Sequence, residues 1–256
     1  MKIGFPNNPR KDPLKEIEWI GKNGFDFVDF FLEAELTDLN KINIEKIKQL
    51  LKKYNLDIVG HTSWQLPIAS SIKRLRDACI DELKGYLPVF QKLGVEKVTV
   101  HTCWHGIGGL FSEKEGTKFQ IETLKRIVKE AKRYNIKIML EPVGDPKDKL
   151  KNIKEILESV PGLCFHLDIG HESLHGKDIE KIIETFKGKI VHVHMSDNNK
   201  KSDQHLPIGC GAIDWKTVIK ILKKYYNGTI TLEVFSNDKD YVLISKEKIM
   251  KLWNSS

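Results

Sequence analysis

Residues 97–141, KVTVHTCWHGIGGLFSEKEGTKFQIETLKRIVKEAKRYNIKIMLE, contain the pattern that decides the fold. A short β-branched run, KVTVHT (97–102), is followed by a longer segment of helical period near 114–134 and then by a second short run, KIMLE (137–141). The short runs predict strands and the long segment predicts a helix. A strand, a helix and a strand in this order indicate a parallel pair joined by a helical crossover.

The same alternation occurs eight times along the chain. Strands are predicted at residues 2–6, 25–32, 57–61, 97–102, 137–141, 164–168, 190–195 and 230–235. Helices are predicted near 13–23, 43–54, 71–93, 114–134, 148–158, 178–187, 214–226 and 245–253. Eight units predict a closed (β/α)₈ TIM barrel of the α/β class, and no Gly-x-Gly-x-x-Gly follows the first strand as in a dinucleotide-binding sheet. Because no linker divides the chain, residues 1–256 are expected to form one domain.

The composition fits one large soluble domain. The chain has 256 residues, of which 40% are hydrophobic and 30% charged. It has no apolar run of about 18 residues and no signal-peptide-like start, which predicts a cytoplasmic protein with no membrane partner. The net charge of +7 comes from lysines spread over several helices, as in KIKQLLKKY, and this favours a solvated surface over a nucleic-acid-binding stripe. The four cysteines include no Cys-x-x-Cys pair, so neither disulfides nor a thiolate zinc site is indicated.

Ionisable side chains gather at the carboxyl ends of the predicted strands, where barrel enzymes build their active sites. Strands three to eight end, in order, at His61, His101, Glu141, Asp168, His194 and Glu233, and Glu33 follows strand two. The chain has 9 His and 35 Asp and Glu residues, so chance would place only about one to three of them at eight strand ends. The excess predicts a functional site at the barrel mouth.

Strand alternation divides the remaining candidates. His166 and His192 lie two positions before a strand end, so we expect them one layer below the mouth as hydrogen-bonded supporting groups. The other residues of that layer read as apolar or small: Val59, Thr99, Met139 and Thr231. Three further residues are assigned to the mouth: His171, just past strand six, and Asp203 and His205, on the loop after strand seven. His105 and His175 are assigned to loops, in solvent or at the edge of a substrate.

The mixture of imidazole and carboxylate groups, without thiolates, suits Mn²⁺, Mg²⁺, Co²⁺ or Zn²⁺. The alternative is a network of ion pairs and hydrogen bonds that holds no metal. Crowded carboxylates without a cation repel one another, so the pattern favours a divalent metal.

The sequence resembles the xylose-isomerase-like barrel superfamily, which contains sugar isomerases, ketose 3-epimerases such as D-tagatose 3-epimerase, and endonuclease IV. The resemblance runs through almost the whole chain. It rests on these residues: His61, His101, Glu141-Pro142, Leu167-Asp168-Ile169-Gly170-His171, His192 to Asp197, Asp203 to Gly211 and Leu232-Glu233.

In the epimerase branch, the resemblance implies one divalent metal (Mn, Mg, Co or Zn) held by Glu141, Asp168, His194 and Glu233. The two glutamates would also be the catalytic pair, moving a proton at the carbon next to a ketose carbonyl through an enediolate. His171 would bind a substrate oxygen, and Trp64 and Trp104 would stack on the sugar or serve structural roles. The implied substrate is a sugar or a sugar phosphate, and a homo-oligomer is compatible with this assignment.

In the endonuclease IV branch, the resemblance implies up to three zinc ions and an abasic DNA substrate. All nine ligand types of that branch have a counterpart here: His61, His101, Glu141, Asp168, His171, His194, Asp203, His205 and Glu233. Trp64 also matches an aromatic residue that meets DNA in that branch. The acidic stretch EAELTDLNKIN (33–43) and the short chain differ from the endonuclease.

Two details depart from the usual patterns, and a third favours the sugar branch. Lys200, a candidate substrate contact, replaces the arginine usual in epimerases, and Cys210 replaces the glutamate of the Gly-Glu-Gly common to both branches. Residues 205–215, HLPIGCGAIDW, match an ending found in sugar-isomerase-like members. We therefore predict a metal-dependent sugar isomerase or epimerase. The endonuclease and a barrel that binds metal or sugar without turnover remain the alternatives, and Cys210 motivates the second of these.

Overall fold

The computed structural model describes residues 1–33, 39, 41–104 and 110–255. Within them, eight parallel strands form one closed barrel in sequence order. The strands are β1 (Lys2–Pro6), β2 (Phe27–Leu32), β3 (Asp57–Thr62), β4 (Lys97–His101), β5 (Lys137–Glu141), β6 (Cys164–Asp168), β7 (Ile190–Met195) and β8 (Thr229–Leu232). Closure comes from the pairing of β1 with β8, in which Ile3 lies opposite Ile230. The predicted (β/α)₈ barrel is therefore confirmed.

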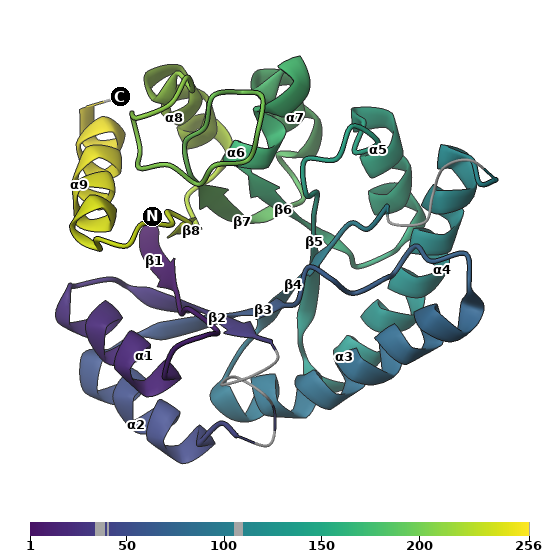
Figure 1. Ribbon diagram of the computed structural model, residues 1–256, viewed down its shortest axis with the longest axis horizontal. Coiled ribbons are helices and arrows are strands. Elements are labelled where there is room, and N and C mark those ends of the chain that lie inside the picture. The colour runs from purple at the N-terminus through teal and green to yellow at the C-terminus, as the bar shows by residue number, and fades with distance from the viewer. Residues whose placement is uncertain (34–38, 40, 105–109, 256) are drawn as a thin grey trace.

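The helices surround the strands, as Figure 1 shows. They are α1 (Pro13–Lys22), α2 (Ile44–Tyr54), α3 (Lys73–Leu93), α4 (Glu113–Ala131), α5 (Leu150–Ser159), α6 (Ile169–Glu172), α7 (Ile179–Phe186), α8 (Trp215–Tyr225) and α9 (Asp240–Ser255), with 3₁₀ turns η2 (Lys132–Tyr134) and η3 (Leu174–Gly176). No helix among the described residues is both long and apolar enough to cross a membrane.

Local sequence signals set the helix ends. The Ser112 side chain accepts a hydrogen bond from the Glu115 backbone N–H, and the Glu115 carboxylate accepts one from the Ser112 N–H, which forms a capping box at the start of α4. At the C-terminal end of α3, Gly94 adopts φ 82°, a left-handed conformation that glycine enters without a steric penalty. These signals explain why most helix boundaries follow from the sequence.

Alternation along each strand divides the core into two parts. On β2, Val28, Phe30 and Leu32 belong to the large apolar core that also contains buried helix residues. Phe27 points the other way and packs with Val59 and Met139 inside the barrel. The apolar core inside the barrel is small because polar side chains occupy the layers between these three residues and the mouth. Those polar side chains are available for binding and catalysis.

Several boundaries differ from the sequence-based prediction by one to five residues. β2 begins at Phe27, two residues later than expected, and β8 ends at Leu232, so Glu233 follows the strand. α9 begins at Asp240, before the predicted start at 245, and Ser245 is a buried residue inside the helix. Its hydroxyl group donates to the Tyr241 carbonyl and accepts from the Ile208 N–H, which satisfies it in the core. The short helix α6 was not predicted, and it positions His171.

Candidate active site

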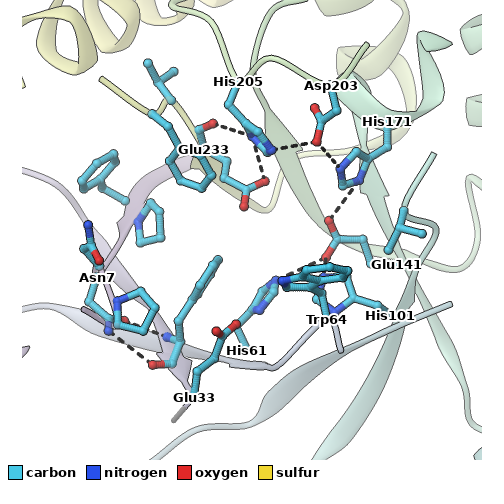
Figure 2. A pocket seen from close by; sticks show the side chains of 18 of the residues that line it. Asn7, Glu33, His61, Trp64, His101, Glu141, His171, Asp203, His205 and Glu233 are labelled. Atoms are coloured by element: carbon cyan, nitrogen blue, oxygen red, sulfur yellow. Dashed lines mark hydrogen bonds and ion pairs between the residues drawn. The ribbon is translucent and has the colours of Figure 1, made fainter. Parts of the chain in front are cut away.

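The carboxyl ends of the strands surround a cavity of about 1010 Å³. Figure 2 shows the labelled side chains pointing into this space. Seven of the nine residues predicted as metal ligands line it: His61, His101, Glu141, His171, Asp203, His205 and Glu233. Asp168 and His194 lie beneath them and are fully buried. The fold therefore brings all nine predicted metal-type residues together.

Glu141, Asp168, His194 and Glu233 form the innermost group. One oxygen or nitrogen atom from each lies within 4.8 Å of those of the others, and all four residues are buried. The His194 Nδ1 atom is 3.1 Å from the Glu233 Oε2 atom, 3.6 Å from the Glu141 Oε1 atom and 3.7 Å from the Asp168 Oδ2 atom. Three carboxylates thus face one ring nitrogen.

This group fits a divalent cation. The Asp168 Oδ2 atom is buried and has no hydrogen-bond partner among the described residues. Burial raises the pKa of Asp168 to about 6, and the carboxylates of Glu233 and Glu141 contribute to the rise. A cation would relieve this repulsion, and a set of three carboxylates with one imidazole suits Mn²⁺, Mg²⁺, Co²⁺ or Zn²⁺.

A second group lies at the rim and consists of His171, Asp203 and His205. The Asp203 Oδ2 atom is 3.2 Å from the His171 Nε2 atom and 2.8 Å from the His205 Nε2 atom, so Asp203 lies between the two rings (Figure 2). Burial disfavours the charged form of His205, but Glu233 and Asp203 together raise its pKa to about 9. This group is linked to the inner one, since the His171 Nδ1 atom is 3.5 Å from the Glu141 Oε1 atom.

Helix α6 explains the position of His171. The Asp168 carboxylate accepts a 2.7 Å hydrogen bond from the His171 backbone N–H and caps this single turn. The same side chain thus belongs to the inner group and starts the helix that carries a residue of the rim group. Sequence spacing placed His171 near strand six, but only this turn directs its ring over the cavity.

His61 and His101 complete the site on the opposite side. Their Nε2 atoms lie 3.3 Å and 3.2 Å, respectively, from the Glu141 Oε2 atom. The His61 ring stacks on Phe31 with ring centroids 3.8 Å apart, which limits its rotation. Glu141 is therefore the central carboxylate of the site, because it contacts His61 and His101 on one side and His171 on the other.

The loop after β7 is held rigidly over the mouth. The buried Asp197 carboxylate accepts hydrogen bonds from the Gly209 N–H at 2.8 Å, the Ile213 N–H at 3.2 Å and the Trp215 Nε1–H at 2.9 Å. The backbone of Asp197 also pairs with that of Leu206. These bonds fix the loop that carries Asp203 and His205.

The weaker sequence candidates separate. Trp64 and Trp104 both line the cavity, but Trp64 is 51% exposed and Trp104 is 4% exposed. Trp104 donates from its Nε1 atom to the buried Asp148 carboxylate at 2.7 Å. Lys200 is exposed on the outer part of its loop and is not among the lining residues, so the structure does not support it as a substrate contact.

The remaining residues and the stretch singled out in the sequence lie around or outside the site. Glu33 lines the cavity, and Cys210 is exposed and does not line it. The His175 ring bonds to the Gly144 carbonyl at 3.1 Å and is not among the residues that line the cavity. His105 and most of the acidic stretch after β2 lie outside the described residues.

One residue of the site was missed from the sequence. Asp29 lies in the middle of β2, is fully buried and bonds through its Oδ2 atom to the His194 Nε2 atom at 2.6 Å. The signal was present, because Asp29 is the only charged residue in the apolar run FVDFFL. The layer below the mouth is thus more polar than expected.

His166 and His192 were both predicted as hydrogen-bonded supporting groups in this layer. His192 has partners on both ring nitrogens, whereas His166 has one on Nδ1 but none on Nε2.

The closed barrel of eight parallel strands places the protein among the (β/α)₈ barrels. The buried cluster of carboxylates and histidines lies at the end of the barrel where such proteins build their functional sites. Residues 17–251 match the Xylose isomerase-like TIM barrel family, and the chain belongs to it. An uncharacterized protein of Methanocaldococcus jannaschii is 30% identical over 91% of this chain and 86% of its own length. A crystal structure of a D-tagatose 3-epimerase-like protein has a TM-score of 0.86 and 28% identity, and the match covers 100% of this chain and 99% of that one.

Two further relatives carry names from the two branches of the family. Inosose isomerase of Halalkalibacterium halodurans is 26% identical over 93% of this chain and 87% of its own length. A probable endonuclease 4 of the Aster yellows witches'-broom phytoplasma is 27% identical over 69% of this chain and 68% of its own length. The isomerase match is the more complete of the two.

Proposed function

We propose that the protein is a divalent-metal-dependent sugar or sugar phosphate isomerase or epimerase. The observation that carries the proposal is the inner group, in which Glu141, Asp168, His194 and Glu233 place a divalent-metal donor set at the base of the cavity. The relatives support the same class, since an inosose isomerase and a D-tagatose 3-epimerase-like protein match nearly the whole chain.

The residues around the cavity account for proton transfer. A divalent metal supplies Lewis-acid polarisation of a carbonyl and a neighbouring hydroxyl oxygen, which acidifies the carbon-bound proton. Glu141 and Glu233 enter the cavity from different sides, as Figure 2 shows. One glutamate accepts the carbon-bound proton to leave an enediolate and then releases that proton to solvent, and the other takes up a solvent proton and returns it to the opposite face of the carbon.

The pKa values of both glutamates favour the base form. Burial opposes their ionisation, but neighbouring histidines more than offset it and hold the pKa of each carboxyl group below its usual value. The closest contacts are His166 and His101 for Glu141 and His194 for Glu233. Each glutamate is therefore available as a carboxylate to accept a proton near neutral pH.

Exchange in deuterated water tests the proposal. Incubation of the metal-loaded protein with ketoses and their phosphates should incorporate deuterium at the carbon next to the carbonyl. Glu141→Gln and Glu233→Gln should each abolish this exchange, whereas Glu172→Gln should leave it within about twofold, because Glu172 is a buried glutamate outside the inner group that pairs with Lys177. Full exchange by either of the first two variants would remove that residue from catalysis.

The rim group favours one alternative, a three-zinc endonuclease acting on abasic DNA. His171, Asp203 and His205 would hold a second ion, and His61 and His101 with the Glu141 Oε2 atom a third. Metal analysis separates the two: about one ion per chain supports the isomerase and about three zinc ions support the endonuclease. Nicking of an abasic duplex without exchange on any sugar would overturn the sugar proposal. One bound ion without either activity would support a non-catalytic barrel.

A further inference from the structure

The feature that carries a further inference is the buried carboxylate of Asp29, inside the barrel below the mouth. Asp29 is 0% exposed and belongs to β2, whose other residues are apolar. A carboxylate in such a place costs several kcal/mol unless it is well hydrogen-bonded. Its partners therefore indicate why the chain keeps it.

Three donors converge on one oxygen of this carboxylate. The Asp29 Oδ2 atom is 2.6 Å from the His194 Nε2 atom, 2.9 Å from the Thr231 Oγ1 atom and 3.3 Å from the His192 Nε2 atom. All four residues are buried with 0% exposure. The shortest of the three contacts is the one to His194, the single imidazole of the inner group.

The hydrogen bonds beyond His192 define the direction in which it donates. The Lys97 Nζ atom donates to the Thr229 Oγ1 atom at 2.6 Å, so the Thr229 hydroxyl hydrogen is free to donate to the His192 Nδ1 atom, 2.7 Å away. An ionised carboxylate only accepts hydrogen bonds, so the Nε2 atom 3.3 Å from the Asp29 carboxylate carries the one N–H of a neutral His192 ring and donates to Asp29. Asp29 is thus held as an acceptor from below.

His194 is then constrained from both sides. Its Nε2 atom donates to Asp29, so Nδ1 is the ring atom that faces the carboxylates of Glu233, Glu141 and Asp168 and whose lone pair a bound cation would take. Carboxylates that accept the second N–H of a metal-binding histidine fix its tautomer and ring orientation and raise its basicity. The observed contacts have this arrangement.

We propose that Asp29 is a positioning residue that presents the Nδ1 atom of His194 to the divalent metal of the inner group, with His192 and Thr231 holding Asp29 in place. The inference rests on the proposed function, because it assumes that the inner group binds a metal. Asp29 touches neither the metal nor the substrate in this proposal. It acts only through His194.

Metal affinity provides the first test. The protein is stripped with a chelator and titrated with Mn²⁺ and Zn²⁺ against a competing indicator. Asp29→Asn should weaken binding about 10- to 100-fold, since a neutral amide is a poorer acceptor for the imidazole N–H. The matched control is Asp148→Asn, which also neutralises a buried aspartate, 1% exposed, but has no bond to the inner group and should bind within about twofold of the wild type.

The spectrum of the imidazole provides a second test, whose first readout is made on the wild type and needs no folded Asp29 variant. In the zinc-loaded wild type, the ¹⁵N and ¹H signals of His194, assigned by their loss in His194→Gln, should show a protonated Nε2 atom with a strongly downfield proton. In Asp29→Asn the same proton should move upfield, and in Asp148→Asn it should not move. An unprotonated Nε2 atom in the wild type would overturn the inference.

The outcomes separate this inference from the function on which it rests. If the wild type binds no divalent metal, the proposed function fails and the inference fails with it. If the wild type binds metal and Asp29→Asn binds it equally tightly, only the inference is overturned. Uptake of an additional ion that Asp29→Asn loses would also overturn it, because Asp29 would then be a ligand and not a hydrogen-bond acceptor.

Discussion

At the scale of single residues, Asp197 shows how one buried carboxylate organises part of the site. It accepts hydrogen bonds from the loop after β7 and from the first residue of α8, and it is 0% exposed. Three different residues donate to this one carboxylate, so its loss would leave three N–H groups without their acceptor. The Asp197 carboxylate stabilises the loop, whereas the carboxylates that surround His194 are assigned to metal binding and catalysis in the proposed function.

Asp197→Asn should lower the free energy of unfolding by about 3 kcal/mol, since an amide nitrogen would then face backbone and indole N–H donors. Asp214→Asn is the matched control. Asp214 caps α8 through the Thr217 N–H at 3.2 Å, and asparagine caps helices about as well as aspartate, so little change is expected. Urea unfolding of both variants measures the difference. Equal destabilisation would contradict the assigned role of Asp197.

The two tryptophans of the cavity should behave differently on replacement by alanine. Trp104→Ala should cost about 3 to 5 kcal/mol of stability, because the ring is 4% exposed and bonds to Asp148. Trp64→Ala should change stability by about 0.5 kcal/mol or less, because the ring is 51% exposed. Thermal and urea unfolding measure both. A raised KM for Trp64→Ala alone would support its proposed contact with substrate.

At the scale of elements, the loop between β7 and α8 decides the geometry of the rim. The Ala212 N–H bonds to the Asn198 carbonyl at 2.8 Å, and the Phe235 N–H bonds to the His205 carbonyl at 3.0 Å. The loop is thus tied to itself and to the segment after β8. Such a closed network requires a close approach of backbone atoms, which Gly211 permits.

Gly211→Ala should destabilise the protein by about 2 kcal/mol. A Cβ atom at this position would lie 2.3 Å from the Asp197 Oδ1 atom and 2.4 Å from the Asn198 carbonyl oxygen, so the loop would have to move. Gly188→Ala is the control, because a Cβ atom there has no neighbour within 4 Å. A denaturation midpoint that is the same for the two variants would show that the loop adjusts freely.

At the scale of the whole molecule, polar groups extend from the mouth through the barrel to its opposite end. Lys97, at the start of β4, donates to the Val191 carbonyl at 2.7 Å and to the Thr229 hydroxyl at 2.6 Å. Burial lowers the pKa of its ammonium group to about 8. The closed barrel therefore holds a partly buried cation far from the candidate metal group.

This shift predicts a pH dependence of stability. Between about pH 8 and the usual lysine pKa of 10.5, the folded state releases the Lys97 proton while the unfolded state keeps it. The unfolded state then binds more protons, so stability rises with pH in this window. The free energy of unfolding of the wild type minus that of Lys97→Met should increase from pH 8 to pH 10, since the other lysines contribute to both proteins. A constant difference would contradict the lowered pKa.

Much of the fold and of the candidate site followed from the sequence. The alternation of strand and helix predicted the closed barrel, and the residues at strand ends, from His61 to Glu233, converge because parallel strands direct their carboxyl ends to one side. The start of α9 and the turn α6 did not follow from it. The buried Ser245 hydroxyl accepts a hydrogen bond from the distant Ile208 N–H, and the Asp168 side chain that caps α6 gave no local signal that separated it from a ligand.

The sequence by itself determined the barrel and the set of residues at its mouth, because periodicity and strand direction are local properties of the chain. Only the tertiary structure decided which atoms of that set face one another. Asp29 and His194 are 165 positions apart, and they meet because β1 pairs with both β2 and β8 and so closes the sheet. The level at which an inward residue lies depends on the stagger of all eight strands, which no single segment encodes.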